Sequence, residues 1–173
     1  MNFKTFFALV FLTIANSQVF ASTSPEQEID CLAQNIYFEA RSEPLDGQLA
    51  VAHVVVNRVA DKRFPNSVCE VVYEARVSKW HEKNTGKVVP LRNQCQFSWY
   101  CDGKPDIVRK DSKQWKTAKA LAHVVYYMAV QYNYAVDKTS GSTHYHADYV
   151  NPRWANTMVR VVKIGRHIFY RWD

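Results

Sequence analysis

The sequence predicts an α+β fold that is mainly α, with a small C-terminal β-hairpin. Three stretches, residues 26–42, 46–60 and 112–132, carry apolar residues at the 3.6-residue spacing of an amphipathic helix. The tail VRVVKIGRHIFYRW is rich in branched and aromatic residues around Gly165, which is typical of two strands joined by a turn. The sequence contains no internal repeat, low-complexity run or evident interdomain linker, so these elements are expected to share one core.

The N-terminus, residues 1–21, predicts a secretory signal peptide. Lys4 precedes an apolar run from Thr5 to Ala15, and small or branched residues stand before an expected cleavage site after Ala21. A membrane anchor is the alternative, but the run is short for a span of roughly 20 residues. No cysteine follows Ala21 directly, so a lipoprotein anchor is not indicated. We expect an exported protein, periplasmic or extracellular, with a single domain over residues 22–173.

The first helix is expected from Glu26 to about Ser42, because Pro44 disfavours helical geometry at the residue before it. Asp46 is expected to cap a second helix, which extends to about Ala60. Together these two helices carry most of the apolar residues of the N-terminal half.

A short third helix is expected within SVCEVVYE, starting at Asn66 or Ser67. From Arg76 to Lys110 the periodicity is lost, and glycines and prolines interrupt the chain. Irregular regions of this length in a compact domain are usually functional or cover the core. The strongest helix follows, from residue 112 to about residue 132.

Four cysteines in an exported chain predict two disulfides. Four cysteines allow three pairings, and we expect Cys31 to pair with Cys69 and Cys95 with Cys101. A zinc site is the alternative, but the sequence contains no C-x2-C pair.

The charge is mildly basic. The formal net charge of +6 becomes +5 when residues 1–21 are removed, because they carry Lys4 and no acid. Such a charge suits an anionic polymer, either a cell wall or nucleic acid, although ordinary solubility explains it as well. The basic residues form no block of five or six, which argues against a nucleic-acid-binding arm.

Glu39 stands in a costly place for a charge, beside the apolar Ile36, Tyr37 and Phe38. Partial burial without a cation raises the pKa of a carboxyl group, which then keeps its proton near neutral pH. A general acid for glycosidic-bond cleavage requires such a proton. The alternative is a salt bridge on the surface of the helix, which the spacing alone also allows.

Glycoside hydrolases usually use two carboxylates, roughly 5 to 9 Å apart. Glu43 is the nearest acid in the sequence, but it would follow the first acid on the same helix and cannot easily flank a sugar from the other face. The other candidates are Asp46, Asp102, Asp106 and Asp148. A single acid is enough if the C6 hydroxyl of the sugar replaces water and closes a 1,6-anhydro ring.

Five blocks of the sequence resemble, in order, the SleB-type cell-wall hydrolases, a family known for spore-cortex lysis and also present as exported proteins. These blocks are IYFEARSEPLDGQLAVAHVVVNRV, FPNSVCEVVY, QFSWYCDGK, THYHADYVNPRWA and IGRHIFY, and they cover nearly all of residues 30–170. The resemblance implies a compact lysozyme-like domain that acts on peptidoglycan glycan strands, in characterised cases as a lytic transglycosylase. It places the essential acid at Glu39. Phe38 and Ser42 stand where the family often has glycine, which leaves the preferred type of strand open.

The resemblance also implies two walls of a substrate cleft. One is the loop between the second pair of cysteines, and the other contains His144, Tyr145 and His146, with Tyr145 stacking on sugar or holding the acid by a hydrogen bond. The expected substrate-binding residues are Tyr37, Gln48, Gln96, Phe97, Ser98, His144 and Tyr145. Coverage of the core is the alternative role for Phe97, and the two histidines are as consistent with a structural role. Asn57 and Arg58 are expected to cap or pair locally.

The sequence therefore predicts an exported lytic transglycosylase that cuts the β-1,4 bond between N-acetylmuramic acid and N-acetylglucosamine, with Glu39 as acid and base. We expect peptidoglycan as the partner, with no cofactor, metal, nucleic acid or stable membrane insertion after signal cleavage; the oligomeric state is open. Three alternatives remain: a hydrolytic muramidase or glucosaminidase with a second carboxylate, a wall-binding module without turnover, and a metal-dependent amidase that uses His144 and His146.

Overall fold

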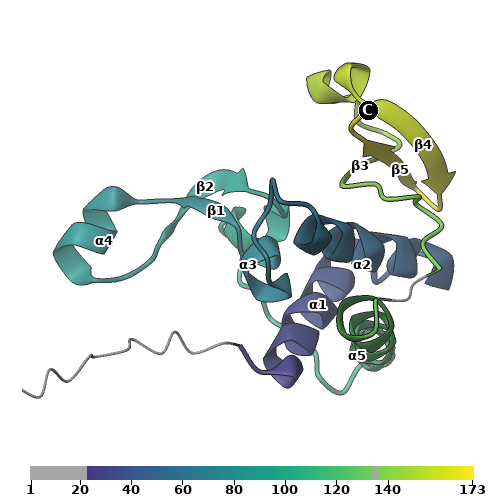
Figure 1. Cartoon of the computed structure of the whole chain (residues 1–173). Helices are drawn as coiled ribbons and strands as arrows, with labels where there is room; N and C mark the ends of the chain where they lie inside the picture. The colour runs from purple at the N-terminus through teal and green to yellow at the C-terminus, as the bar shows by residue number, and fades with distance from the viewer. Residues whose placement is uncertain (1–22, 134–135) are drawn as a thin grey trace, which may run out of the picture.

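The computed structural model describes residues 23–133 and 136–173, and the predicted signal peptide, residues 1–21, lies outside them. The fold is a mainly helical α+β domain with a small C-terminal antiparallel sheet, which confirms the predicted fold class. A group of crossing helices forms the body, the sheet lies on one side of it, and a narrow arm projects from another side (Figure 1). No helix of the described residues is both long and apolar enough to cross a membrane.

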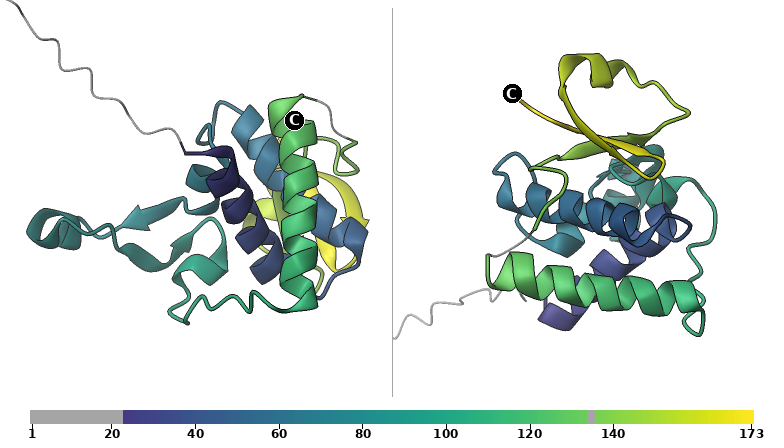
Figure 2. Two further views of the ribbon diagram at one scale, coloured as in Figure 1. Left: turned by 90° about the horizontal axis from the view of Figure 1, so that it is seen from below. Right: turned by 90° about the vertical axis from the view of Figure 1, so that its right-hand side faces the viewer.

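The helical body is built around α1 (Pro25–Ala40), which packs against α2 (Leu45–Ala60), α3 (Val68–Val72) and α5 (Lys113–Val125), as Figure 2 shows from two further sides. Branched residues from the first three of these helices form the most deeply buried part of the core. The fully buried ones include Ile29, Leu32, Ile36, Val55, Val71 and Val72. Burial of each such side chain contributes about 1.5–3 kcal/mol, so this core fixes the end of α1 that carries Glu39.

The helix boundaries follow local capping. Ser24 and Gln27 form a capping box at the start of α1, and this helix ends at Ala40, two residues before the expected end. The predicted cap of α2 was wrong: Pro44 occupies the cap position without a side-chain hydrogen bond, and Asp46 lies in the first turn. An acidic residue in a first turn still interacts favourably with the helix dipole.

The last predicted helix divides into two parts. Ser112 caps α5 by accepting a hydrogen bond from the Trp115 backbone N–H. After Val125 the chain continues as a π-helical segment, η2 (Tyr126–Gln131). The predicted α-helix to about residue 132 is therefore correct in extent but not in its hydrogen bonding.

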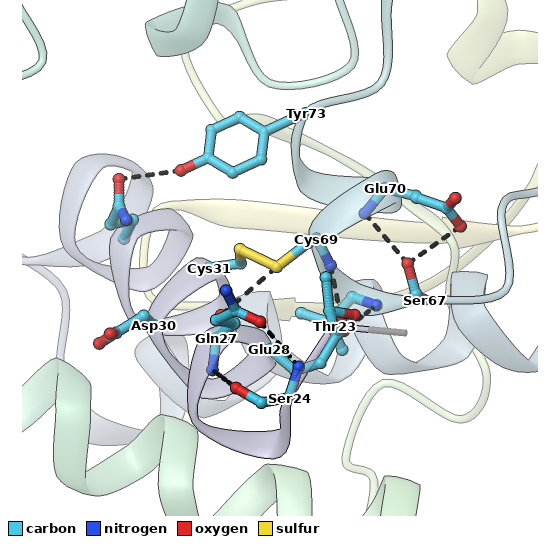
Figure 3. The surroundings of a disulfide bond; sticks show 12 residues. Thr23, Ser24, Gln27, Glu28, Asp30, Cys31, Ser67, Cys69, Glu70 and Tyr73 are labelled. Atoms are coloured by element: carbon cyan, nitrogen blue, oxygen red, sulfur yellow. Dashed lines mark hydrogen bonds between the residues drawn. A yellow bond between two sulfur atoms is a disulfide. The ribbon is translucent and has the colours of Figure 1, made fainter. Parts of the chain in front are cut away.

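A buried carboxylate and a disulfide hold α3 against α1 (Figure 3). Glu28, 5% exposed, accepts hydrogen bonds from the backbone N–H groups of Val68 at 2.6 Å and Cys69 at 3.2 Å. These are free N–H groups of the first turn of α3, which need an acceptor when they are buried. Cys69 also forms a disulfide with Cys31 of α1. The second disulfide joins Cys95 to Cys101, so both pairs are those expected from the sequence.

The C-terminal sheet consists of β3 (His144–Ala147), β4 (Val159–Ile164) and β5 (His167–Arg171), with η3 (Arg153–Thr157) between the first two strands. The strands are antiparallel in the order β3-β5-β4. Phe169 on the central strand is fully buried in a second cluster with Ala50 and Val54 of α2. This packing places β3 beside the helical body.

The turn of the predicted hairpin requires glycine. Gly165 has a φ of 57°, and a Cβ at this position would overlap the Glu43 carboxylate. That carboxylate accepts a hydrogen bond of 2.9 Å from the backbone N–H of Arg166. Glu43 therefore fastens the hairpin to the start of α2.

The region expected to be irregular contains regular elements. Residues 75–95 form an arm in which β1 (Ala75–Val77) pairs antiparallel with β2 (Pro90–Cys95), and α4 (Lys79–Thr85) lies between them. The short 3-10 helix η1 (Ser98–Cys101) follows. Residues 86–89 and 102–110 match the irregular chain that the sequence predicted, whereas the short strands and helices of this region leave little pattern in the sequence.

Candidate active site

A cleft of about 1040 Å³ lies beside the end of α1. Its walls come mainly from four parts of the chain: the end of α1, the loop that follows the arm, the irregular chain before α5, and β3 with the turn after it. Single residues of α2, α5 and β5 complete the lining. The lining residues are Tyr37, Phe38, Glu39, Arg41, Ser42, Arg58, Gln96, Phe97, Ser98, Trp99, Asp102, Lys104, Pro105, Asp106, Ile107, Arg109, Ser112, Gln114, Tyr145, His146, Ala147, Tyr149, Val150 and His167.

Glu39 lies in the last turn of α1, half-buried in the wall of this cleft. Burial raises the pKa of its carboxyl group, while the hydrogen bond from Tyr145 and the positive charge of Arg58 act in the opposite direction. Within residues 23–133 and 136–173 Glu39 takes part in no salt bridge, which removes the surface-pair alternative. The raised pKa that the sequence predicted is confirmed in direction.

Tyr145 is the direct polar partner of the acid. Its hydroxyl donates a hydrogen bond of 3.0 Å to Oε2 of Glu39. Burial, followed by the nearby Glu39 charge, raises the pKa of this hydroxyl well above 10, so the group keeps its proton and remains a donor at neutral pH. Its ring packs against Phe169 and His167 of the central strand, with centroids 5.6 and 5.0 Å away, which fixes the position of the hydroxyl.

Arg58 contributes a buried cation to the same wall, a position that the sequence did not predict. It is 4% exposed, and its Nε donates a hydrogen bond of 2.8 Å to the backbone carbonyl of Thr143. Its guanidinium lies over the rings of Phe64 and Phe97, at 5.2 and 5.1 Å from their centroids. The expectation of local pairing was therefore wrong, because its partners come from segments far along the chain.

The disulfide-closed loop divides its residues between the cleft and the core. Gln96 and Ser98 are exposed in the cleft wall, whereas Phe97 is 2% exposed and packs into the main core while its edge still lines the cleft. Phe38 stacks on Trp99 with ring centroids 4.7 Å apart. The bulky residue before the acid therefore packs against this loop as well as lining the cleft.

The remaining predicted binding residues do not all reach the cleft. Tyr37 lines it but is 5% exposed and belongs mainly to the core. Gln48 is outside the lining, and its Nε2 donates a hydrogen bond of 2.9 Å to the backbone carbonyl of Glu43. His144 is also outside the lining and packs against Trp154 and Trp172. Burial, with nearby arginines, lowers the pKa of His144 to about 4, so it is neutral at pH 7.

The candidate second carboxylates separate into two groups. Asp46 pairs with Lys138 at 2.9 Å and Asp148 with Lys163 at 2.8 Å, and neither lines the cleft. Glu43, described above, is also outside it. Only Asp102 and Asp106 share the cleft with Glu39.

These two aspartates differ electrostatically. The backbone N–H and the ammonium group of Lys104 lower the pKa of Asp102, which keeps its carboxylate ionised. Burial and the adjacent Asp102 raise the pKa of Asp106. Both aspartates are candidates for a second carboxylate, and the lowered pKa of Asp102 favours its ionised form more strongly.

Several cleft residues were not predicted. Tyr149, Ile107 and Val150 are exposed apolar side chains in the lining, with exposed fractions of 73%, 72% and 46%. Exposed aromatic and aliphatic side chains in a cleft can pack against sugar rings. The only signal for them in the sequence was their position within an irregular stretch and within one of the family-like blocks.

The metal alternatives find little support in the side chains. The described part of the chain contains no group of three or more His, Cys, Asp and Glu residues arranged to hold a metal ion. All four cysteines are in disulfides. The Nε2 atom of His146 lies 2.9 Å from the hydroxyl of Tyr170, so this ring already has a hydrogen-bond partner.

Comparison with known proteins identifies the family. The family described as Cell Wall Hydrolase matches residues 42–170 of this chain. The chain belongs to the cell wall hydrolase family. The match starts three residues after Glu39, so it does not include this candidate acid.

The solved relatives have the same fold. The cell wall hydrolase is similar to the catalytic domain of the germination-specific lytic transglycosylase SleB from Bacillus anthracis, with 29% identity, 88% of this chain and 98% of that chain covered, and a TM-score of 0.59. The catalytic domain of the Bacillus cereus SleB protein matches with 26% identity, 87% and 94% coverage, and a TM-score of 0.52.

Two spore cortex-lytic enzymes are similar in sequence. The Oceanobacillus iheyensis enzyme is 43% identical over 145 residues, which is 83% of this chain and 41% of the relative. The Bacillus cereus enzyme is 28% identical over 145 residues, 83% of this chain and 44% of the relative. The cell wall hydrolase therefore spans less than half the length of these relatives.

Proposed function

We propose that this protein is a lytic transglycosylase that cuts the β-1,4 bond between N-acetylmuramic acid and N-acetylglucosamine in peptidoglycan, with Glu39 as its single acid and base. The observation that carries the proposal is a half-buried carboxyl group with a raised pKa, hydrogen-bonded to Tyr145, in a large open cleft. The solved relative named as a lytic transglycosylase supports this reaction class.

The proposed reaction has two steps. First, the Glu39 carboxyl donates its proton to the glycosidic oxygen as the bond from that oxygen to C1 of the muramic acid breaks. Second, the C6 hydroxyl of the same sugar attacks C1, its proton passes to the Glu39 carboxylate, and a 1,6-anhydro ring closes. Glu39 ends the cycle protonated, so neither water nor a cofactor is consumed.

The neighbours of Glu39 suit both of its states. Burial favours the protonated acid that the first step needs. The Tyr145 hydroxyl and the Arg58 cation favour the carboxylate that is present between the steps. These two effects oppose burial, so the carboxylate formed in the first step is less costly than burial alone would make it.

The surface of the cleft suits a glycan. Gln96 and Ser98 offer amide and hydroxyl groups, and Tyr149 offers an exposed aromatic face. Sugar recognition commonly combines such polar groups with aromatic faces in an open cleft. The disulfides and the cell wall hydrolase family fit an extracytoplasmic site of action, and we propose export through the segment 1–21.

Hydrolysis is the second candidate, because Asp102 is an ionised carboxylate in the same cleft. In that reaction Asp102 would direct water instead of the C6 hydroxyl. We therefore propose an assay of soluble fragments released from purified peptidoglycan by residues 22–173, with Glu39→Gln and Asp102→Asn variants.

The lytic proposal predicts that Glu39→Gln loses at least about 1,000-fold in rate, while Asp102→Asn stays within about 3-fold of the unmodified protein. A comparable loss in both variants would favour hydrolysis through two carboxylates. Equal release by the unmodified protein and Glu39→Gln would overturn the role of Glu39. Tight binding with no release by any form would leave a wall-binding module.

A further inference from the structure

The arm formed by residues 75–95 extends away from the helical body. Figure 1 and the left view of Figure 2 both show β1 and β2 leading outward to α4, which lies at the far end. None of the residues of α4 is buried. The core therefore gains nothing from this tip, and its side chains face solvent.

The tip carries side chains that a solvated surface does not require. Trp80 is 65% exposed and Val88 is 67% exposed. Tryptophan is among the residue types most enriched at the energetically important positions of contact sites. The tip is also held in a defined shape, since Ser78 caps α4 and its backbone N–H donates a hydrogen bond of 2.8 Å to the carbonyl of Val89.

Most of the net positive charge of the protein lies on this arm. Five basic residues and a single acid, Glu82, leave the arm with +4 of the formal +6 of the whole chain. The basic residues are Arg76, Lys79, Lys83, Lys87 and Arg92. They form no continuous block in the sequence, but the β-ribbon and α4 gather them on one projecting element. The arm thus presents a concentrated positive field to an anionic partner.

The arm is continuous with the active-site cleft. β2 ends at Cys95, whose disulfide with Cys101 closes the loop that places Gln96 and Ser98 in the cleft wall. The backbone N–H of Gln96 donates a hydrogen bond of 3.0 Å to the carbonyl of Glu74, the residue just before the arm. The arm is therefore attached directly beside the cleft wall.

We propose that the tip of the arm binds peptidoglycan outside the catalytic cleft, on a strand next to the one being cut. Trp80 packs on the apolar face of a sugar ring, and Lys79, Lys83 and Lys87 pair with the free carboxylates of the stem peptides. This inference rests on the proposed function for the identity of the polymer, but not for any step of the reaction.

A membrane surface fits the arm less well. An interfacial helix needs a broad apolar face, whereas α4 has the sequence KWHEKNT, with Trp80 as its single large apolar residue. A glycan contact requires only one aromatic ring with charges around it. The observations therefore favour an anionic glycopeptide over a lipid layer.

The test is co-sedimentation of the protein with purified insoluble peptidoglycan, in a Glu39→Gln background so that the polymer stays intact. Two arm variants are compared, Trp80→Ala and the double variant Lys79→Ala/Lys83→Ala. The matched control is Arg160→Ala/Arg171→Ala, which removes two exposed charges from the C-terminal sheet. Alanine is a good helix former, and thermal melting checks that every variant is folded.

We expect both arm variants to bind about 10-fold more weakly, with a smaller salt dependence for the double lysine variant, and the control to bind like its parent. Binding of the arm variants equal to that of the parent would overturn the proposal. Loss of binding to vesicles containing anionic phosphatidylglycerol, with sacculus binding unchanged, would also overturn it and assign the arm to a membrane.

The inference and the proposed function fail separately. In the background with Glu39 intact, Trp80→Ala is expected to cleave a short soluble glycan oligomer at the unmodified rate, because such an oligomer occupies the cleft alone. A loss of oligomer cleavage by Trp80→Ala would place the arm within the catalytic site and contradict a separate contact. Failure of all forms to cleave the oligomer would reject the reaction without affecting the binding result.

Discussion

The hydroxyl of Tyr145 lies 3.0 Å from Oε2 of Glu39, although 106 residues separate the two in the sequence. The bond joins the last turn of α1 to β3 of the C-terminal sheet. The sheet is held against α2 by Phe169 and its turn by Glu43. The geometry of the acid thus depends on both layers of the fold.

Replacement of Tyr145 by Phe should slow the reaction and move its pH dependence. Loss of a hydrogen bond to a charged group costs about 1.5–3 kcal/mol, or roughly 10- to 100-fold in rate. Because the bond lowers the pKa of Glu39, its loss raises that pKa, and the alkaline limb of the rate profile should move to higher pH. Measurement of rate against pH checks both effects.

The matched control for this variant is Tyr149→Phe, which removes a hydroxyl from a cleft tyrosine that makes no hydrogen bond to Glu39. Its alkaline limb should remain in place. An unchanged limb in Tyr145→Phe would show that the hydroxyl does not act on the acid.

Replacement of Arg58 by Met should move the alkaline limb of the rate profile in the same direction, because it removes a positive charge near Glu39. Its positive charge lowers the pKa of Glu39 without a direct hydrogen bond. The variant is expected to keep Glu39 protonated to higher pH and to lower the maximal rate by about 10-fold or more, since the carboxylate formed between the steps loses a stabilising charge. A shift of the limb to lower pH would contradict the account. The control is Arg166→Met. Arg166 lies outside the cleft lining, and its guanidinium lies over the ring of Tyr149.

Glu39→Gln should stabilise the fold at neutral pH. A carboxyl group whose pKa is raised by folding binds more protons in the native state, so stability falls as pH rises from the unfolded pKa through the native one. Burial raises the pKa of Glu39. Gln at this position does not titrate, so this loss of stability with rising pH is removed. In thermal melting, the melting temperature of the variant should exceed that of the unmodified protein by a larger amount at pH 8 than at pH 4. A constant difference would mean that the group is not perturbed.

The two disulfides should have different effects when they are removed. Cys31–Cys69 closes 38 residues and Cys95–Cys101 closes 6, and loop entropy predicts losses of about 4 and about 2 kcal/mol. The loss of activity should be larger when Cys95–Cys101 is removed, because only this shorter loop forms a cleft wall. Paired Cys→Ser variants, compared by denaturant unfolding and by rate at a temperature where both are folded, test this. Equal activity losses would contradict the role of the Cys95–Cys101 loop.

The sequence predicted the parts of the fold that local patterns specify. The apolar periodicity of residues 26–60 and 112–132 predicted α1, α2 and the region of α5 with η2, and the residues around Gly165 predicted the hairpin. The cap of α2 was predicted at Asp46 because aspartate is a common capping residue, whereas Pro44 occupies that position in the structure. The change to π-helical bonding after Val125 has no marker in composition.

Long-range contacts explain what the sequence could not predict. In the sequence, Arg58 stands near the end of a predicted helix, where a cap or a local pair is expected. Its burial depends on Phe64, Phe97 and the Thr143 carbonyl, which come together only in the folded chain. His144 is adjacent to Tyr145, but it lies outside the cleft lining, among aromatic residues. The arm was missed because its charges are dispersed along the chain and its strands are short.

The most direct test of the central claim is digestion of purified peptidoglycan in water enriched in ¹⁸O, followed by chromatography and mass spectrometry of the products, with Glu39→Gln as control. A lytic reaction closes the ring with the sugar's own C6 hydroxyl, so we predict 1,6-anhydro-muramic ends without ¹⁸O, absent from the control. Reducing ends that carry ¹⁸O would contradict the claim, because water would then be the acceptor and a second carboxylate such as Asp102 would be needed.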